Sequence, residues 1–153
     1  MNMGVNADHG AIPACLREMQ LDLNLLKVQV GNFGSLVFFG LGIGSLLVSL
    51  VIGRISYKML IALSCIGNSF GLFMFAYCIN YQYLCFARFF CGVNQIAVCI
   101  YHPLFTDTFG TKETKPIWMS TMILAPSLGV VSGYVLTFFT IKVFDSWRLS
   151  FTI

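Results

Sequence analysis

The sequence predicts an all-α protein whose helices cross a membrane several times, and three observations support this fold class. Apolar residue types make up 58% of the 153 residues, and charged types only 10%. A soluble domain carries about 25% charged residues, so polar groups are too few here to cover a water-exposed surface. The charged residues also leave four long apolar intervals, and each can hold the about 20 residues of a membrane-spanning helix.

These four intervals define the expected spans: residues 33–52, 59–78, 83–104 and 116–140. Asn80-Tyr81-Gln82 is the only polar break between the second span and the third, so these two are expected to be antiparallel neighbours. Pro126 lies inside the fourth span and predicts a kink or a local unwinding there.

The two ends of the chain are interpreted as parts of further helices. Residues 1–15 are expected to be the end of a preceding helix, followed by a polar loop over residues 17–27. Residues 147–153 begin a new apolar run and are expected to start another helix.

Composition and motifs exclude several classes of function. The net charge of +3 comes from nine scattered basic residues, so no nucleic-acid partner is expected. The six cysteines form no CxxC pair, which argues against a disulfide framework and against a zinc site. No phosphate-binding loop, dinucleotide motif or nucleophile motif occurs. We therefore expect no enzyme activity, no metal and no cofactor.

Arg88 is the most informative polar residue, because it lies about two turns into the third span. A charged side chain inside a membrane costs about 2.5–3.5 kcal/mol on insertion scales, so it usually faces a watery cavity or a partner. The other interpretation is that Arg88 extends to the nearby membrane interface. Helical spacing places Arg88, Gly92 and Gln95 on one face, which favours a polar stripe. The alternative for Gln95 is a hydrogen bond between helices.

Two further features each have two interpretations. Asp8 and His9 either relay a proton or pair with a basic group such as Arg88, or they lie in an exposed loop; sequence position favours the loop. The GxxxG pairs (Gly40 with Gly44, Gly129 with Gly133) indicate close helix packing, and on the Pro126 helix the alternative is a pliable gating helix.

Taken in order, these features resemble the N-terminal half of a major facilitator superfamily transporter. Five segments carry the resemblance: residues 6–13 (end of helix 1), 49–58 (the GxLADRxGRK motif), 88–92 (RxxxG of helix 4), 126–133 (helix 5) and 147–151 (WR..F of helix 6). The first and third segments also resemble the spinster-like subgroup of lipid transporters. Where helix 4 of that subgroup tends to carry a glutamate, this chain has Gln95, which argues against proton coupling at that position.

The resemblance implies a partial N-terminal six-helix half of a secondary transporter for a small solute or a lipid-like molecule. It implies that the loops holding Arg54 and Lys112 are cytoplasmic. It also implies a substrate cavity formed by Asp8, Arg88, Asn94 and Gln95. The residues expected to contribute to gating are Arg54, Lys58, Pro126, Gly129 and Gly133. Gly53 stands where the motif has an aspartate that helps to latch the two halves, so the latch is either weaker or supplied elsewhere.

The expected partners are the lipid bilayer, a small-molecule substrate, and the missing C-terminal half or a partner chain that replaces it. Transporters of this family have about twelve helices and work by rocking one half against the other. We therefore expect the chain to be a fragment, a partial gene model or a decayed copy. The alternative is a transport-inactive membrane protein that binds a partner through its glycine faces. The sequence does not distinguish the plasma membrane from an organelle membrane.

Overall fold

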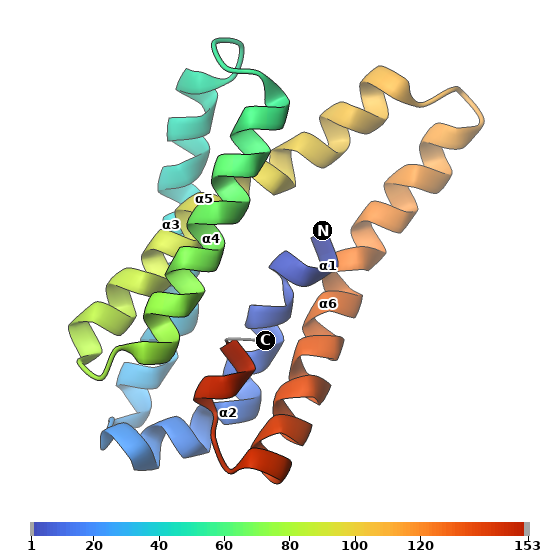
Figure 1. The fold of residues 1–153 in the computed structure, drawn as a ribbon. Coiled ribbons are helices and arrows are strands. Elements are labelled where there is room, and N and C mark those ends of the chain that lie inside the picture. Colours follow the sequence, from blue (N-terminus) through green and yellow to red (C-terminus); the bar gives the residue numbers. More distant parts are fainter. Residues whose placement is uncertain (1, 152–153) are drawn as a thin grey trace.

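The computed structural model describes residues 2–151, which form helices joined by short connections (Figure 1). In chain order the elements are α1 (Asn2–Val5), α2 (Ala7–Leu23), α3 (Lys27–Val51), α4 (Tyr57–Tyr77), α5 (Tyr81–Phe109), α6 (Thr114–Phe144) and the 3-10 helix η1 (Arg148–Phe151). Within these described residues no strand forms, and the β-type contact found there is an isolated bridge between Ile52 and Ile55. The predicted all-α fold class is confirmed.

Helices α3 to α6 have 25, 21, 29 and 31 residues, and each is long and apolar enough to cross a membrane. Their number agrees with the four apolar intervals of the sequence. Each helix extends beyond its predicted span at one or both ends. The reason is that a polar residue ends an apolar interval but does not end a helix, which continues into the headgroup regions on either side of the about 30 Å hydrocarbon core.

Helix α2 corrects the expectation of a polar loop over residues 17–27, because the helix continues to Leu23. Its inner face explains this: Cys15 and Met19 are completely buried (0% exposed), so apolar packing keeps the segment helical. The helix ends at Asn24, whose φ of 51° lies in the left-handed region that Asn readily adopts after a helix.

Pro126 does not unwind α6, which is a continuous α-helix over Thr114–Phe144. A proline removes one backbone donor, and the hydrogen bonds on either side of it keep the helix together. At the C-terminal end, the start of the expected next helix is the 3-10 turn η1, and residues 152–153 lie outside the described part of the chain.

The helices form two groups (Figure 1). In the first group α5 packs along both α3 and α4, and in the second α6 packs along α1 and α2. Contacts between the groups are sparser and involve α2 with α3, α5 with α6, and η1 with α4. The α3–α4 and α5–α6 connections lie at the same end of the molecule (Figure 1), as expected for helices that cross a membrane alternately.

Glycines allow the helices within each group to approach closely. A Cβ atom on Gly44 of α3 would lie 2.7 Å from the carbonyl oxygen of Val93 on α5, and one on Gly133 of α6 would collide with the backbone of Ala7 on α2. Gly40 and Gly129 are packed in the same way, against α5 and α1. Both GxxxG faces are therefore used for close packing inside this chain.

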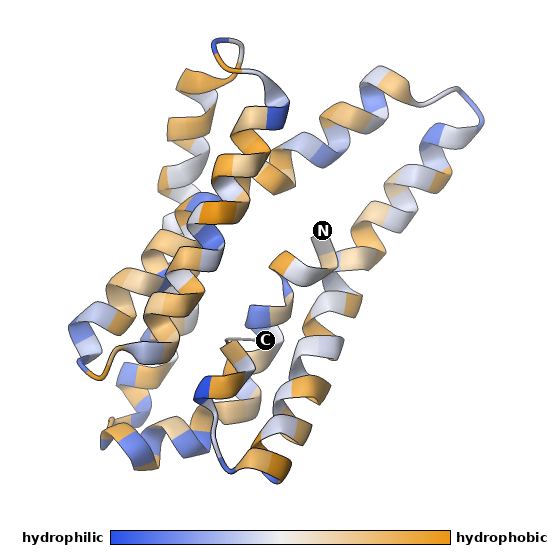
Figure 2. Ribbon diagram, in the orientation of Figure 1, coloured by the Kyte–Doolittle hydropathy of each residue, from blue (hydrophilic) through white to orange (hydrophobic). Residues whose placement is uncertain are grey.

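Hydrophobic residues recur along the long helices (Figure 2), and many of their large apolar side chains are exposed. Large side chains such as Phe38, Leu46, Leu136 and Phe139 are between 57% and 67% exposed. Apolar surface of this extent is unfavourable in water and favourable against lipid chains. Together with the four spans, it shows that the chain is an integral multi-pass membrane protein.

Candidate functional site

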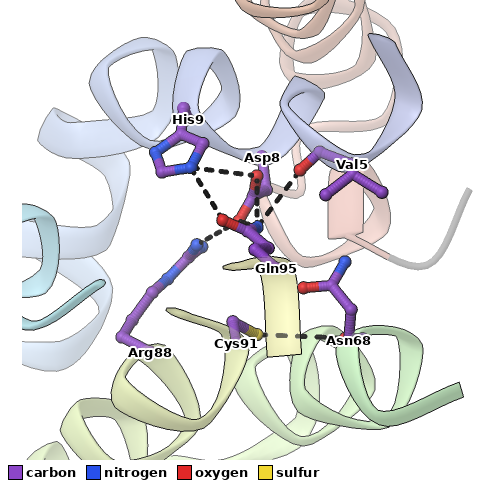
Figure 3. Close-up of polar contacts among 7 residues, drawn as sticks. All are labelled: Val5, Asp8, His9, Asn68, Arg88, Cys91 and Gln95. Atoms are coloured by element: carbon purple, nitrogen blue, oxygen red, sulfur yellow. Dashed lines mark hydrogen bonds and ion pairs between the residues drawn. The ribbon is translucent and has the colours of Figure 1, made fainter. Parts of the chain in front are cut away.

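A polar cluster joins the two helix groups inside the bundle (Figure 3). Asp8 comes from the first turn of α2, whereas Arg88 and Gln95 come from one face of α5. Arg88 Nη1 donates a hydrogen bond of 3.0 Å to Asp8 Oδ2. The Gln95 amide nitrogen lies 3.3 Å from Asp8 Oδ1 and 3.2 Å from Asp8 Oδ2. The single carboxylate thus accepts hydrogen bonds from two side chains of α5.

All three of these side chains are buried. The residues Asp8, Arg88 and Gln95 are 5%, 0% and 2% exposed. Isolated charges are very unfavourable in such a setting, whereas a hydrogen-bonded pair of opposite charges is tolerated. The pairing of Asp8 with Arg88 is therefore confirmed, and both the exposed-loop interpretation of Asp8 and the interface interpretation of Arg88 are wrong. Sequence position is misleading here, because residues near the N-terminus form a helix that packs along α6, and the first turn of this helix is hydrogen-bonded to α5.

His9 and Val5 complete the hydrogen bonding of Gln95 (Figure 3). The Gln95 amide nitrogen also donates to the carbonyl oxygen of Val5 at 3.1 Å. Because this nitrogen faces acceptors only, Gln95 Oε1 must be the acceptor for His9 Nε2, which lies 3.0 Å away. His9 Nε2 therefore donates this hydrogen bond, and it lies 4.0 Å from Asp8 Oδ1. The neutral Gln95 links the two titratable residues of the cluster.

Two aromatic rings flank the guanidinium group of Arg88. Its Cζ atom lies 4.0 Å from the ring centroid of Phe75 on α4 and 5.2 Å from that of Phe151 on η1. Arginine is stabilised over aromatic faces by cation–π attraction. The sequence marks Phe151 only as part of the WR..F segment, and nothing in it distinguishes Phe75 among fifteen phenylalanines or places either ring beside Arg88.

A cavity of about 340 Å³ lies beside the cluster, on the side of α6. Asp8 forms part of its wall, and the remaining lining is mainly apolar: Ala7, Ala11, Leu72, Leu136 and Phe151. Its volume falls in the about 300–1,000 Å³ range of small-molecule pockets. The cavity therefore combines room for a small organic molecule with one charged residue in its wall.

The other predicted site residues lie elsewhere. Asn94 faces α4: its amide donates to the Phe90 carbonyl oxygen at 2.8 Å, and its own backbone oxygen accepts from Ser64. Arg54 lies in the α3–α4 connection and Lys58 in the first turn of α4, and both residues are exposed. Of the three predicted gating residues on α6, Gly133 lines the cavity. Within residues 2–151 no three His, Cys, Asp or Glu side chains come together as a metal site would require.

A second polar contact fixes the position of η1. Asp22 Oδ2, near the end of α2, accepts hydrogen bonds from Trp147 Nε1 at 3.1 Å and from Arg148 Nη2 at 3.0 Å. Arg148 also donates to the backbone oxygens of Ala76 and Cys78 at the end of α4. These bonds hold the short helix that carries Phe151. Asp22 was not predicted, because its partners lie more than 120 residues away in the sequence.

Replacing Asp22 by Asn is expected to loosen η1 without unfolding the bundle. The Asp22–Arg148 pair is partly exposed, and such pairs contribute about 0–1 kcal/mol, so global stability should change little. Hydrogen exchange of the amides in residues 148–151 should become faster. Glu18→Gln, one turn earlier on the same helix, is the control and should leave this exchange unchanged. Unchanged exchange in Asp22→Asn would show that these bonds do not hold η1.

The spans and the cluster define an integral membrane protein with a buried charged site between its helices. The family model of the Major Facilitator Superfamily matches residues 6–153. The chain therefore belongs to the major facilitator superfamily and is a transporter of that type, a class that is in general not enzymatic. No curated protein sequence matches the chain.

Gly53 stands where the superfamily motif has an aspartate, and the backbone conformation at this position suits a glycine. Its φ of +94° lies where residues with a side chain are rarely found, and the turn between α3 and α4 depends on it. An aspartate at this position would strain the turn. That the latch is either weaker or supplied elsewhere stays a prediction.

Proposed function

We propose that this chain provides the N-terminal half of a secondary transporter and that Asp8, Arg88 and Gln95 line its substrate path. The observation that carries the proposal is the fully buried Asp8–Arg88 ion pair beside the cavity. Gln95 is the middle residue of α5, so the cluster lies near the expected bilayer midplane. Ionisable residues at that depth typically mark substrate or ion pathways.

Transport by alternating access requires a second half against which this bundle rocks. We propose that further residues of the same polypeptide or a partner chain provide it, with the substrate held between the halves. The substrate is proposed to be a small solute or a lipid-like molecule. The proposal rests on the superfamily as a whole, because no contact in the cluster favours the spinster-like subgroup in particular.

The transport-inactive alternative receives less support from the packing. It requires glycine faces that are free to bind a partner. The Gly40–Gly44 pair is instead packed against α5, and the Gly129–Gly133 pair against α1 and α2. Gly34 and Gly42 of α3 meet open space, but they are eight residues apart and form no GxxxG pair.

The test is uptake by the full-length protein that contains this chain, reconstituted in liposomes. The liposomes are incubated with a defined mixture of amino acids, sugars, nucleosides, organic acids and lysolipids, and the lumen is analysed by mass spectrometry. We expect at least one compound to accumulate, and Arg88→Ala to reduce this uptake to the level of empty liposomes. Arg17→Ala, which removes an exposed arginine of α2, is the matched control and should transport normally.

Two results would contradict the proposal. Normal uptake by Arg88→Ala would remove Arg88 from the substrate path. If the folded wild-type protein accumulates no compound of the mixture, the transport-inactive alternative is favoured instead.

A further inference from the structure

Three buried donor atoms without a hydrogen-bond partner belong to one residue of the cavity wall and to one residue behind that wall. Two are Nε and Nη2 of Arg88, and the third is Oγ of Ser150; within residues 2–151 none of them finds an acceptor. Ser150 lines the cavity together with Phe151 and Asp8. Arg88 lies directly behind the last two, hydrogen-bonded to Asp8 and facing the Phe151 ring. A buried donor without a partner costs free energy of folding, so these three atoms indicate a missing acceptor.

The geometry of the unpaired edge identifies the kind of acceptor that fits. Arg88 uses Nη1 for Asp8, which leaves Nε and Nη2 on the adjacent edge of the planar guanidinium. The N–H groups of this edge are parallel and match the two oxygens of a carboxylate or a phosphate. The partner of Arg88 is therefore expected to be a planar or tetrahedral oxyanion.

Charge favours a carboxylate over a phosphate. Arg88 contacts Asp8 as a permanent cation, and Asp8 already compensates this charge. A monoanion adds one negative charge to a buried site, whereas a phosphate monoester dianion adds nearly two. The penalty for burying uncompensated charge is thus smaller for the carboxylate.

We infer that the free edge of Arg88 binds the carboxylate of the transported substrate, whose apolar body occupies the adjacent cavity. This inference rests on the proposed function and names the substrate class: monocarboxylates with an apolar chain. Ala7, Ala11, Leu72 and Leu136 surround the chain of the substrate, and Ser150 Oγ donates to a carboxylate oxygen. No bond is made or broken in this step.

Phe151 controls access to the free edge. Its ring forms part of the cavity wall and also faces the guanidinium group, so it lies between the two. Rotation of this side chain, or displacement of the four-residue helix η1, lets the carboxylate reach Nε and Nη2. The Asp22 contacts that hold η1 then limit the rate of binding rather than the final affinity.

The experiment measures direct binding to the full-length protein in lipid nanodiscs by calorimetry. The probes are octanoate and octanamide, which share the same chain and differ in charge, and empty nanodiscs correct for their partition into lipid. We expect octanoate to bind about tenfold more tightly than octanamide, or more, a difference that a charge-assisted bidentate contact can supply. Arg88→Gln should abolish this preference, and Arg17→Gln is the matched control.

Ser150→Ala provides a second variant that leaves the Asp8–Arg88 pair intact. It should weaken octanoate binding a few-fold while octanamide binding stays unchanged. Equal binding of the two probes to the wild-type protein would overturn the inference, and so would a preference for octanoate that survives in Arg88→Gln. Tighter binding of octyl phosphate than of octanoate would overturn the carboxylate assignment.

These outcomes can be separated from those of the proposed function. If octanoate shows no preferential binding while other solutes are still taken up in an Arg88-dependent way, the inference fails alone. If the uptake experiment fails for every compound, the proposed function fails as well.

Discussion

Replacing Asp8 by Ala is expected to destabilise the folded protein by about 3–5 kcal/mol, the usual cost of removing one partner of a buried ion pair. The reason is that Arg88, which is 0% exposed, would lose the acceptor of its Nη1 group and keep an uncompensated charge. Denaturant unfolding of the protein in detergent micelles, followed by circular dichroism, measures the free energy of unfolding.

The exposed ion pair of the α5–α6 connection provides a matched control. Asp107 and Lys115 are 62% and 41% exposed in their side chains, so Asp107→Ala should cost about 1 kcal/mol at most. The double variant Asp8→Leu with Arg88→Met should be more stable than Asp8→Ala, because it removes both charges together. An Asp8→Ala protein as stable as Asp107→Ala would contradict the structure of the cluster.

A Gly133→Ala substitution is expected to separate α6 from α2 and to destabilise the protein by about 1–3 kcal/mol, as overpacking does in a close-packed interior. The added methyl group would collide with backbone atoms of Ala7, which cannot move aside as a flexible side chain does. The same unfolding measurement applies.

Gly42→Ala is the control for this prediction, and it should change stability in the opposite direction. Nothing lies within 4 Å of a Cβ atom at Gly42 of α3, so the methyl group meets open space. Alanine is favoured over glycine in a helix by about 1 kcal/mol. A Gly133→Ala protein that gains stability as Gly42→Ala does would show that α2 and α6 are not in backbone contact.

The spans could be predicted from the sequence because the lipid environment imposes a length and an apolar composition on each of them. Helix ends such as those of α5 and α6 could not, since polar residues beyond the hydrocarbon core still take helical conformation. The expectation of a loop over residues 17–27 was also wrong. Cys15 and Met19 are buried in α2 against residues distant in sequence, and this packing cannot be read from the local sequence.

The site was predicted in part. A charged residue inside an apolar span indicates a buried partner, and this led to Arg88, while helical spacing added Gln95. Asn94 is adjacent to Gln95 in sequence, but successive residues of an α-helix are rotated by about 100°. Asn94 therefore faces α4 instead. Phe75, Phe151 and Asp22 could not be found in this way, because each acts through contacts with other helices.

The sequence by itself therefore determined that the protein is a bundle of membrane-spanning helices with a charge inside it, because composition and spacing are local properties. Only the tertiary structure decided between the two interpretations of Asp8. Its pairing with Arg88 spans 80 residues of sequence and depends on α2 packing along α6 with its first turn hydrogen-bonded to α5. The tertiary structure also decided that one edge of Arg88 has no acceptor within residues 2–151, because this depends on where the neighbouring acceptors lie.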